Sequence, residues 1–197
     1  GQWVRAFKYD DTKLSEGRPI NRFDIDALVP DHPVAVSHRG GHTSVYNSMA
    51  LAMAGVTSET PDPPGGRFYR DSNGSLTGLV AGPARSVFNS LIPSDSTREQ
   101  RKDGVKLITE LMTKSGLTSV HQTGASRNDM LAYQDARAEG NMRFRMYLFP
   151  RGQLFDDLVN AGVRTGMGDE VFRIGAVKFT ADGSASERTM RMSTPFE

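Results

Sequence analysis

The order of apolar and polar positions divides the chain into two halves of different texture. In residues 1–93, turn signals such as the Pro and Gly run at 59–66 and the Asn73-Gly74 pair separate short apolar runs. The pattern predicts strands over 2–9, 33–37, 68–70 and 76–80, and helices over 45–54 and 84–91. We therefore expect the first half to be a loop-rich α+β region.

From residue 94 onward the pattern is more regular. Ser96 and Glu99 form a predicted capping box, after which apolar residues recur at helical spacing. The predicted helices cover 96–115, 127–139 and 154–161, and the predicted strands cover 117–121, 142–149 and 171–180. Strands separated by helices of this length are typical of parallel crossover units. Residues 94–197 are therefore predicted to be part of an α/β barrel or of an open parallel sheet.

The amino-acid composition excludes some classes of partner but says little about the function. The 197 residues carry 24 Lys and Arg against 23 Asp and Glu, a net charge of +1 with no long run of either sign. Nucleic acid and anionic membranes are therefore not expected as partners. Cys is absent, so any metal must be bound by His, carboxylate or a modified side chain. No apolar stretch approaches the ~20 residues of a membrane span, which predicts a soluble protein, expected in the cytoplasm with secretion left open.

Lys178 is the residue with the most chemical interest, because it falls inside the predicted strand 171–180. A lysine among apolar strand residues must be paired or chemically altered. Carboxylation of its amine gives a carbamate, an anionic oxygen ligand that can bridge two divalent metals. The alternative is that Lys178 pairs with Asp182 or extends to the edge of the sheet, and the spacing does not separate the two.

Two further places could contact a substrate. His121 would end its predicted strand, where parallel α/β sheets collect function; the simpler interpretation is a histidine bonded to a backbone carbonyl. Arg39 and His42 flank Gly40-Gly41 before the predicted helix 45–54, whose free amides could bind an anion or a carbonyl oxygen. His42 fits a site or a structural role equally well. Asn47 is expected to organise the turn.

Seven short blocks, taken in order, resemble the YtcJ-like branch of amidohydrolase family 3. They are WVRAFKYDD near the start, DIDALVPDHPVAV (24–36), RGGHTSVYNSMAL (39–51), TPDPPGG (60–66), DSNGSLTG (71–78), GLTSVH (116–121) and VKFTADGS (177–184). The resemblance implies a metal-dependent hydrolase of non-peptide C–N bonds of the amide type, in which metal-activated hydroxide attacks a carbonyl. It also implies a (β/α)8 barrel, with strands two to four in 94–197 and the loop-rich insertion in 1–93.

The resemblance also implies a metal centre with one or two divalent ions, expected to be zinc. In the family an HxH pair, a carboxylated lysine, two further histidines and an aspartate hold the metals, and Lys178 matches the lysine. The chain contains no HxH, so most ligands are expected outside it. We therefore expect a segment of a longer enzyme that is inactive by itself. His42, Arg39 and His121 become candidate substrate contacts and Asp182 a residue that orients the Lys178 loop, while the catalytic base stays unknown.

A different class of function stays open beside the enzyme. The chain could be a catalytically inactive binding or assembly module derived from such an enzyme, burying its open sheet edges against another copy in a homo-oligomer. Lys178 would then pair with an acid and bind no metal. A metal-free hydrolase built on His121 lacks a nucleophile with a base beside it. The expected partner of the enzyme is a small amide-type substrate: amide, formamide, urea-like or cyclic imide.

Overall fold

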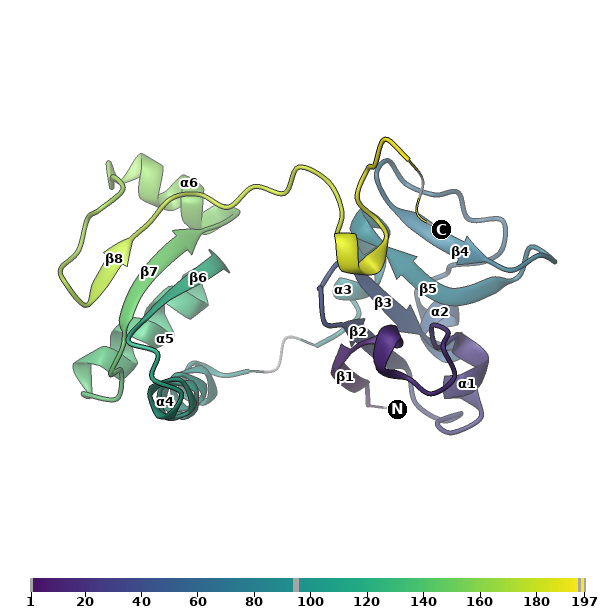
Figure 1. Cartoon of the computed structure of the whole chain (residues 1–197), viewed down its shortest axis with the longest axis horizontal. Helices are drawn as coiled ribbons and strands as arrows, with labels where there is room; N and C mark the ends of the chain where they lie inside the picture. Colours follow the sequence, from purple (N-terminus) through teal and green to yellow (C-terminus); the bar gives the residue numbers. More distant parts are fainter. Residues whose placement is uncertain (1, 94–95, 195, 197) are drawn as a thin grey trace. The chain divides into compact units, whose positions relative to one another are not determined.

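The structure, a computed structural model, describes residues 2–93, 96–194 and 196. Internal contacts divide the chain into two compact units, one formed by residues 1–94 together with 181–197 and the other by residues 95–180 (Figure 1). Residues 181–197, which the sequence pattern groups with the second half, therefore pack with the first.

The first unit is built on a five-stranded sheet. Its strands, in spatial order, are β1 (Val4–Tyr9), β2 (Val34–His38), β3 (Thr43–Tyr46), β5 (Leu76–Ala81) and β4 (Arg67–Arg70). β1 runs parallel to β2, and the other neighbours are antiparallel. The predicted strands and the predicted hairpin around the Asn73-Gly74 turn are confirmed within one or two residues at each end.

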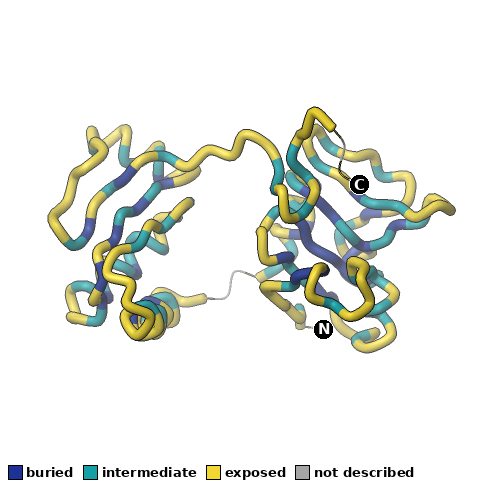
Figure 2. Tube along the Cα trace, viewed as in Figure 1, coloured by how far each residue is buried: buried dark blue, intermediate teal, exposed yellow. Residues whose placement is uncertain are grey.

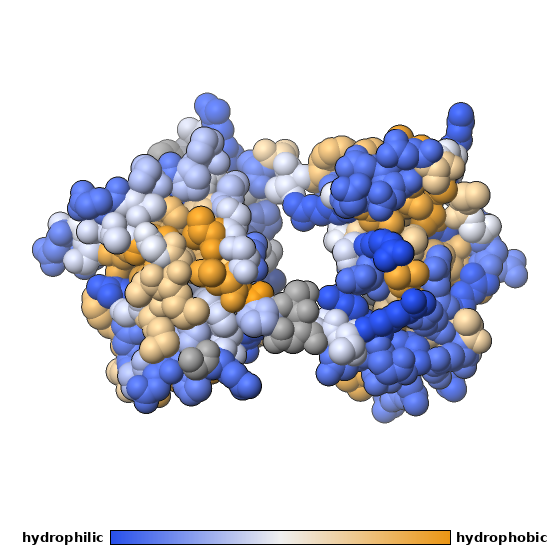
Figure 3. All heavy atoms as spheres, turned by 180° about the vertical axis from the view of Figure 1, so that it is seen from behind, coloured by the Kyte–Doolittle hydropathy of each residue, from blue (hydrophilic) through white to orange (hydrophobic). Residues whose placement is uncertain are grey.

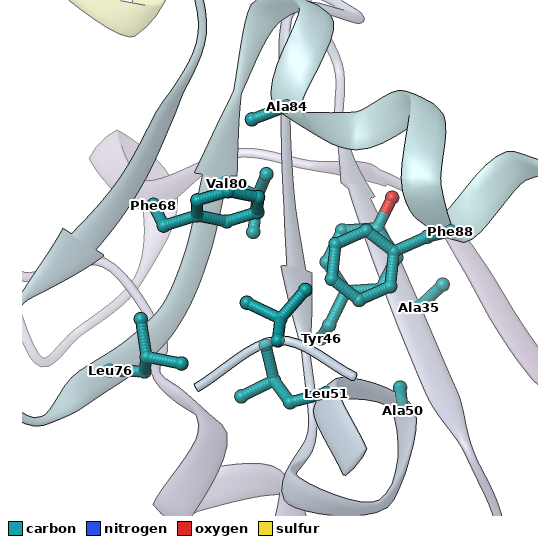
Figure 4. Close-up of a cluster of buried hydrophobic side chains, with 10 residues drawn as sticks. Ala35, Tyr46, Ala50, Leu51, Phe68, Leu76, Val80, Ala84 and Phe88 are labelled. Carbon is teal, nitrogen blue, oxygen red and sulfur yellow. The ribbon is translucent and has the colours of Figure 1, made fainter. Parts of the chain in front are cut away.

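Short helices cover this sheet. They are α1 (Arg22–Asp26), α2 (Ser48–Met53), α3 (Ser86–Asn89) and the 3₁₀ helices Asp11–Lys13, Gly82–Arg85 and Ala185–Glu187. The deepest burial follows the central strands (Figure 2). In the main core the rings of Tyr46 and Phe88 stack with centroids 3.7 Å apart, beside Leu51, Phe68 and Val80 (Figure 4). Aromatic and aliphatic burial of this kind holds α2 and α3 against the sheet.

The predicted helix over 45–54 begins too early. Residues up to Tyr46 continue β3, because Val45 pairs with Leu79 of the neighbouring strand, and the helix starts at Ser48. Asn47 separates the two elements: its Oδ1 accepts from the backbone N–H of Ala50 at 3.1 Å and from that of Val34 at 2.9 Å. The structural role predicted for Asn47 is confirmed, since it caps the helix and ties it to β2.

The second unit is a three-stranded parallel sheet with three helices. The strands are β6 (Ser119–Ala125), β7 (Arg145–Pro150) and β8 (Phe172–Ile174) in that order, and the helices are α4 (Arg98–Lys114), α5 (Arg127–Ala138) and α6 (Gln153–Asn160). The predicted parallel crossover units are confirmed. The capping box of α4 is formed by Thr97 and Gln100, one residue later than predicted from Ser96 and Glu99.

The two faces of this sheet differ. One face packs side chains such as Met146, Leu148 and Phe172 against apolar residues of all three helices, among them Ile108 of α4, Met130 and Tyr133 of α5, and Leu154 and Leu158 of α6. The other face carries His121, Tyr147 and Phe149, whose rings contact one another at centroid distances of 5.3–5.5 Å. His121 is exposed and the two larger rings are half-buried, so this face is less covered than the first.

The predicted strand 171–180 is wrong beyond Ile174. The register pairs Ile174 with Leu148, which would place Lys178 opposite Gly152, the N-cap residue directly before α6. β7 therefore ends before it can offer Lys178 a partner, and Pro150 at its end has no N–H to donate. The last ladder contact is the backbone N–H of Gly175 donating to the carbonyl of Leu148 at 2.7 Å.

Among the described residues, no helix is both long and apolar enough to cross a bilayer. Apolar side chains do reach the surface in patches between polar ones (Figure 3), and Leu28, Phe7 and Phe179 are the most exposed large ones.

Candidate functional site

Polar contacts of several chain segments meet at the hairpin turn between β2 and β3. β2 and β3 pair antiparallel up to Ser37 and Ser44, and residues 39–42 form the turn that follows His38. Gly41 has φ +80, a left-handed conformation that favours glycine, and its N–H donates to the carbonyl of His38 at 3.0 Å. The tight turn therefore directs polar groups of both strand ends toward the same place, next to Gly40.

The carboxylate of Glu187, on the 3₁₀ helix Ala185–Glu187, fills that spot. Its side chain is only 1% exposed. Oε1 accepts from the backbone N–H of His42 at 3.0 Å, and Oε2 accepts from the hydroxyl of Thr43 at 2.5 Å. Gly40 makes the approach possible, because a Cβ there would overlap Oε1 of Glu187. A buried carboxylate is stable only when its oxygens are bonded in this way.

His38 lies beneath the turn, with its side chain 4% exposed. Its Nδ1 accepts from the backbone N–H of Gly40 at 3.1 Å, and its Nε2 lies 3.3 Å from Oδ1 of Asp11. Because Nδ1 is an acceptor here, the neutral ring carries its proton on Nε2 and donates it to Asp11. Oε2 of Glu187 lies 3.6 Å from Nδ1, so the imidazole stands between two carboxylates.

Two arginines balance the charge of these acids. Nη1 of Arg188 donates to Oδ2 of Asp11 at 3.2 Å. Nε of Arg39 lies 2.7 Å from Oδ2 of Asp10, a close ionic contact without good hydrogen-bond geometry. The hydroxyl of Thr12 donates to Oδ1 of Asp10 at 2.7 Å, and this bond, followed by the Thr12 backbone N–H and the charge of Arg39, lowers the pKa of Asp10.

Asp10, Asp11 and His38 are also the residues that could hold a divalent metal. One donor atom of each lies within 4.8 Å of the others, and mixed carboxylate and imidazole donors suit such an ion. The donors already have partners, however. A metal at Nε2 of His38 would have to replace the proton donated to Asp11, and it would compete with Arg39 and Arg188 for the two aspartates.

The structure brings two of the predicted site residues into this cluster and leaves three outside it. Arg39 and His42 lie on the turn, where His42 contributes its backbone N–H; the helix whose free amides were predicted to bind an anion begins later, at Ser48. His121 is the third residue of β6 and not its last, so it lies within the sheet. There it lines a pocket of about 270 Å³ together with Tyr147, Arg145 and Arg173, toward the amino ends of the strands.

Lys178 and Asp182 lie on the segment that follows β8. Lys178 is exposed and belongs to no strand, so the prediction of a lysine buried in a sheet is wrong. Asp182 is exposed, and its Oδ2 accepts from the backbone N–H of Arg191 at 3.0 Å. Asp182 therefore closes a loop over 182–191; its influence on Lys178 stays a prediction.

The residues predicted from the sequence do not include those at the centre of the cluster, which are Asp10, Asp11, His38 and Glu187. Three of these residues could have been predicted. Asp10 and Asp11 come directly after β1, and His38 ends the neighbouring strand β2. Because β1 and β2 are parallel, their carboxyl ends lie side by side. No local signal marks Glu187. It reaches the turn across 145 positions of sequence.

The fold is that of metal-dependent hydrolases of known structure. The chain is similar to crystal structures described as an uncharacterized metal-dependent hydrolase from Pyrococcus horikoshii OT3 and another from Pyrococcus furiosus. The TM-scores are 0.60 and 0.56 at 21% and 23% identity, over 95% of this chain and 36% and 37% of those chains.

Sequence comparison gives the family. The model of the Amidohydrolase family matches residues 1–197, and the chain belongs to that family. It is 30% identical to "Putative amidohydrolase YtcJ" of Bacillus subtilis over 99% of this chain and 37% of that protein. It is 28% identical to "N-substituted formamide deformylase" of Arthrobacter pascens over 82% of this chain and 30% of that protein. The chain thus spans about a third of the length of these relatives.

Proposed function

We propose that the whole protein is a hydrolase of small molecules with non-peptide, amide-type C–N bonds, and that it uses a divalent metal, zinc. The observation that carries this proposal is the family match over all 197 residues. The relative named as an N-substituted formamide deformylase supports the bond type. When bound, the metal would activate water and polarise the substrate carbonyl.

The second unit fits strands two to four of a (β/α)8 barrel. In such a barrel helices cover the outer face of the parallel sheet, and side chains of the inner face fill the interior. The parallel order β6-β7-β8 has all three helices packed on one face. His121, Tyr147 and Phe149 on the other face would then be interior residues. His121 would serve mainly in ring packing within the barrel.

Lys178 is the residue of this chain that we assign to the metal centre. It lies four residues beyond Ile174, at the carboxyl end of β8, which is the end at which barrels place their active sites. Its exposed amine can react with carbon dioxide, forming a C–N bond to the carboxyl carbon and releasing a proton. The resulting carbamate would be an oxygen ligand for the metal. Arg39, His42 and Asp182 keep the roles predicted for them, in substrate contact and in ordering the Lys178 loop.

Residues 1–197 alone are proposed to be inactive. The chain offers one member of the ligand set that the family resemblance implies, and no residue in it is assigned as the general base. We do not assign the cluster of Asp10, Asp11 and His38 to the metal centre. Both aspartates already contact arginines, and Nδ1 of His38 already accepts from a backbone N–H.

The experiment is an activity screen of the whole protein loaded with zinc, using N-substituted formamides, simple amides, ureas and cyclic imides. We expect hydrolysis of at least one class, loss of activity on chelation, and recovery on adding zinc. Lys178→Ala should remove the activity, whereas Lys114→Ala, another exposed lysine at the end of α4, should retain it. A protein that holds no metal and hydrolyses none of these substrates would instead be the binding or assembly module.

A further inference from the structure

The turn between β2 and β3 has the chemistry of a receptor for a carboxylate. It supplies one donor to each oxygen of Glu187: the backbone N–H of His42 to Oε1 and the hydroxyl of Thr43 to Oε2. Gly40 provides the space in which the group sits. Two donors spaced for two oxygens of one planar group select a carboxylate.

The strand pairs that flank the receptor do not involve Glu187. Thr43 pairs with Ala81 of β5, and Ser44 pairs with both Ser37 and Val80, so the turn is fixed by strands on both sides. Glu187, by contrast, lies at the end of a three-residue 3₁₀ helix. The donors therefore belong to a rigid element, and their occupant belongs to a short segment that is docked on it.

The docked segment shows backbone strain. Arg188, the residue after Glu187, has φ +53, a left-handed conformation that is uncommon for residues other than glycine. Its guanidinium donates to Asp11 at 3.2 Å. The two neighbouring side chains thus enter the first unit together, Glu187 at the turn and Arg188 at Asp11, and their contacts hold a conformation that the isolated segment would not favour.

We propose that the β2–β3 turn is a binding site for small carboxylates, that Glu187 is its internal occupant, and that formate or acetate takes the site when Glu187 is absent. Planar carboxylates are preferred over phosphate, because the turn offers one donor to each of only two oxygens, the N–H of His42 and the hydroxyl of Thr43. The site uses the backbone N–H of His42, so it stands whether or not the His42 side chain contacts the substrate of the proposed hydrolysis. In a protein that hydrolyses amides, the carboxylate product would belong to this ligand class, so binding there would compete with the docking of residues 184–188.

The experiment measures the thermal unfolding of the whole protein as a Glu187→Ala variant, with sodium formate or acetate titrated against sodium chloride at equal ionic strength. The variant is expected to unfold at a lower temperature than the wild type. Formate or acetate in the millimolar range should raise its Tm by a few degrees in a saturable way, whereas chloride should not. The wild type should show no such response, because its own carboxylate fills the site.

Two controls keep the inference falsifiable. Adding Thr43→Val to Glu187→Ala removes the hydroxyl donor and should abolish the response to carboxylate. If Glu187→Ala does not fold in chloride, Glu187→Ser keeps a small polar side chain but still empties the space of the carboxylate, and it should show the same carboxylate-dependent rise in Tm. The inference is overturned if neither variant responds more than the wild type does, or if the Thr43→Val double variant responds equally.

Discussion

Oε1 of Glu187 accepts a hydrogen bond from the backbone N–H of His42 at 3.0 Å, across 145 positions of sequence. This bond joins the last part of the chain to the hairpin turn of β2 and β3, and it places residues 181–197 in the first unit. Arg188 and Asp11 make a second connection beside it. Polar contacts between residues far apart in sequence thus hold this junction together.

Gly40→Ala tests the close approach of Glu187 to the turn. A methyl group at this position would overlap Oε1 of Glu187, so the carboxylate must shift and lose its donors. We expect a loss of about 1–3 kcal/mol in the free energy of unfolding, the usual cost of overpacking. Chemical denaturation measures it.

Gly104→Ala is the matched control for that substitution. Gly104 lies inside α4, and no atom lies within 4 Å of the place that a methyl group there would take. Alanine should therefore stabilise the protein by about 0.5–1 kcal/mol through helix propensity. Equal destabilisation by both substitutions would mean that Glu187 does not depend on the space at Gly40.

His38→Ala tests the imidazole between the two carboxylates. The substitution removes the partner of the exposed Gly40 N–H and leaves Oδ1 of the buried Asp11 without the imidazole. Unsatisfied buried groups cost about 1–3 kcal/mol each, so a loss of at least about 1 kcal/mol is expected in chemical denaturation. An unchanged unfolding free energy would show that the cluster is open to water.

Phe88→Ala should remove a large part of the first core. Phe88 is fully buried and stacks on Tyr46, and truncations of this kind cost about 3–5 kcal/mol. Phe179→Ala is the control, because Phe179 is 80% exposed; its effect should stay within about 0.5 kcal/mol. Similar effects of the two substitutions on the unfolding curve would contradict the assigned core.

Asp24 and Asp169 should make stability depend on pH in the acid range. The guanidinium of Arg18 lowers the pKa of Asp24 to about 2, with help from the backbone N–H of Asn21. Arg137 and the N–H groups of Phe172 and Val171 lower the pKa of Asp169 to about 2. Both pKa values are lower in the folded than in the unfolded chain, where a carboxyl titrates near ~4.

The stabilisation is therefore present above about pH 4 and is lost as the pH falls toward about 2. Replacing both residues, as Asp24→Asn with Asp169→Asn, should flatten the decline of Tm over this range. An unchanged slope would show that other carboxyl groups control the acid unfolding.

The sequence pattern predicts a helix or strand well where local residues alone determine it. The parallel second unit follows from helical and strand periodicity, and the role of Asn47 in its turn is predictable because helix caps are local. The end of β8 is not predictable in this way, since it depends on where the neighbouring strand β7 stops. Apolar alternation around Lys178 therefore suggests a strand that has no partner.

In the candidate site, too, residues marked by a local sequence signal are predictable and residues placed by long-range contacts are not. Arg39 and His42 can be found from the sequence because the Gly-Gly pair between them marks a tight turn. Glu187 cannot be found, because its burial depends on a docking contact with residues far away in sequence. The roles of Lys178 and Asp182 come from the family resemblance and stay predictions.

The zinc content of the whole protein, compared between the wild type and the variants Lys178→Ala and His38→Ala, decides where the metal is bound. We expect Lys178→Ala to lose most of the bound metal, because Lys178 is the proposed ligand. His38→Ala should retain it, because His38 belongs to a cluster neutralised by arginines. Retention of metal by Lys178→Ala together with its loss in His38→Ala would contradict this assignment and place the metal at Asp10, Asp11 and His38.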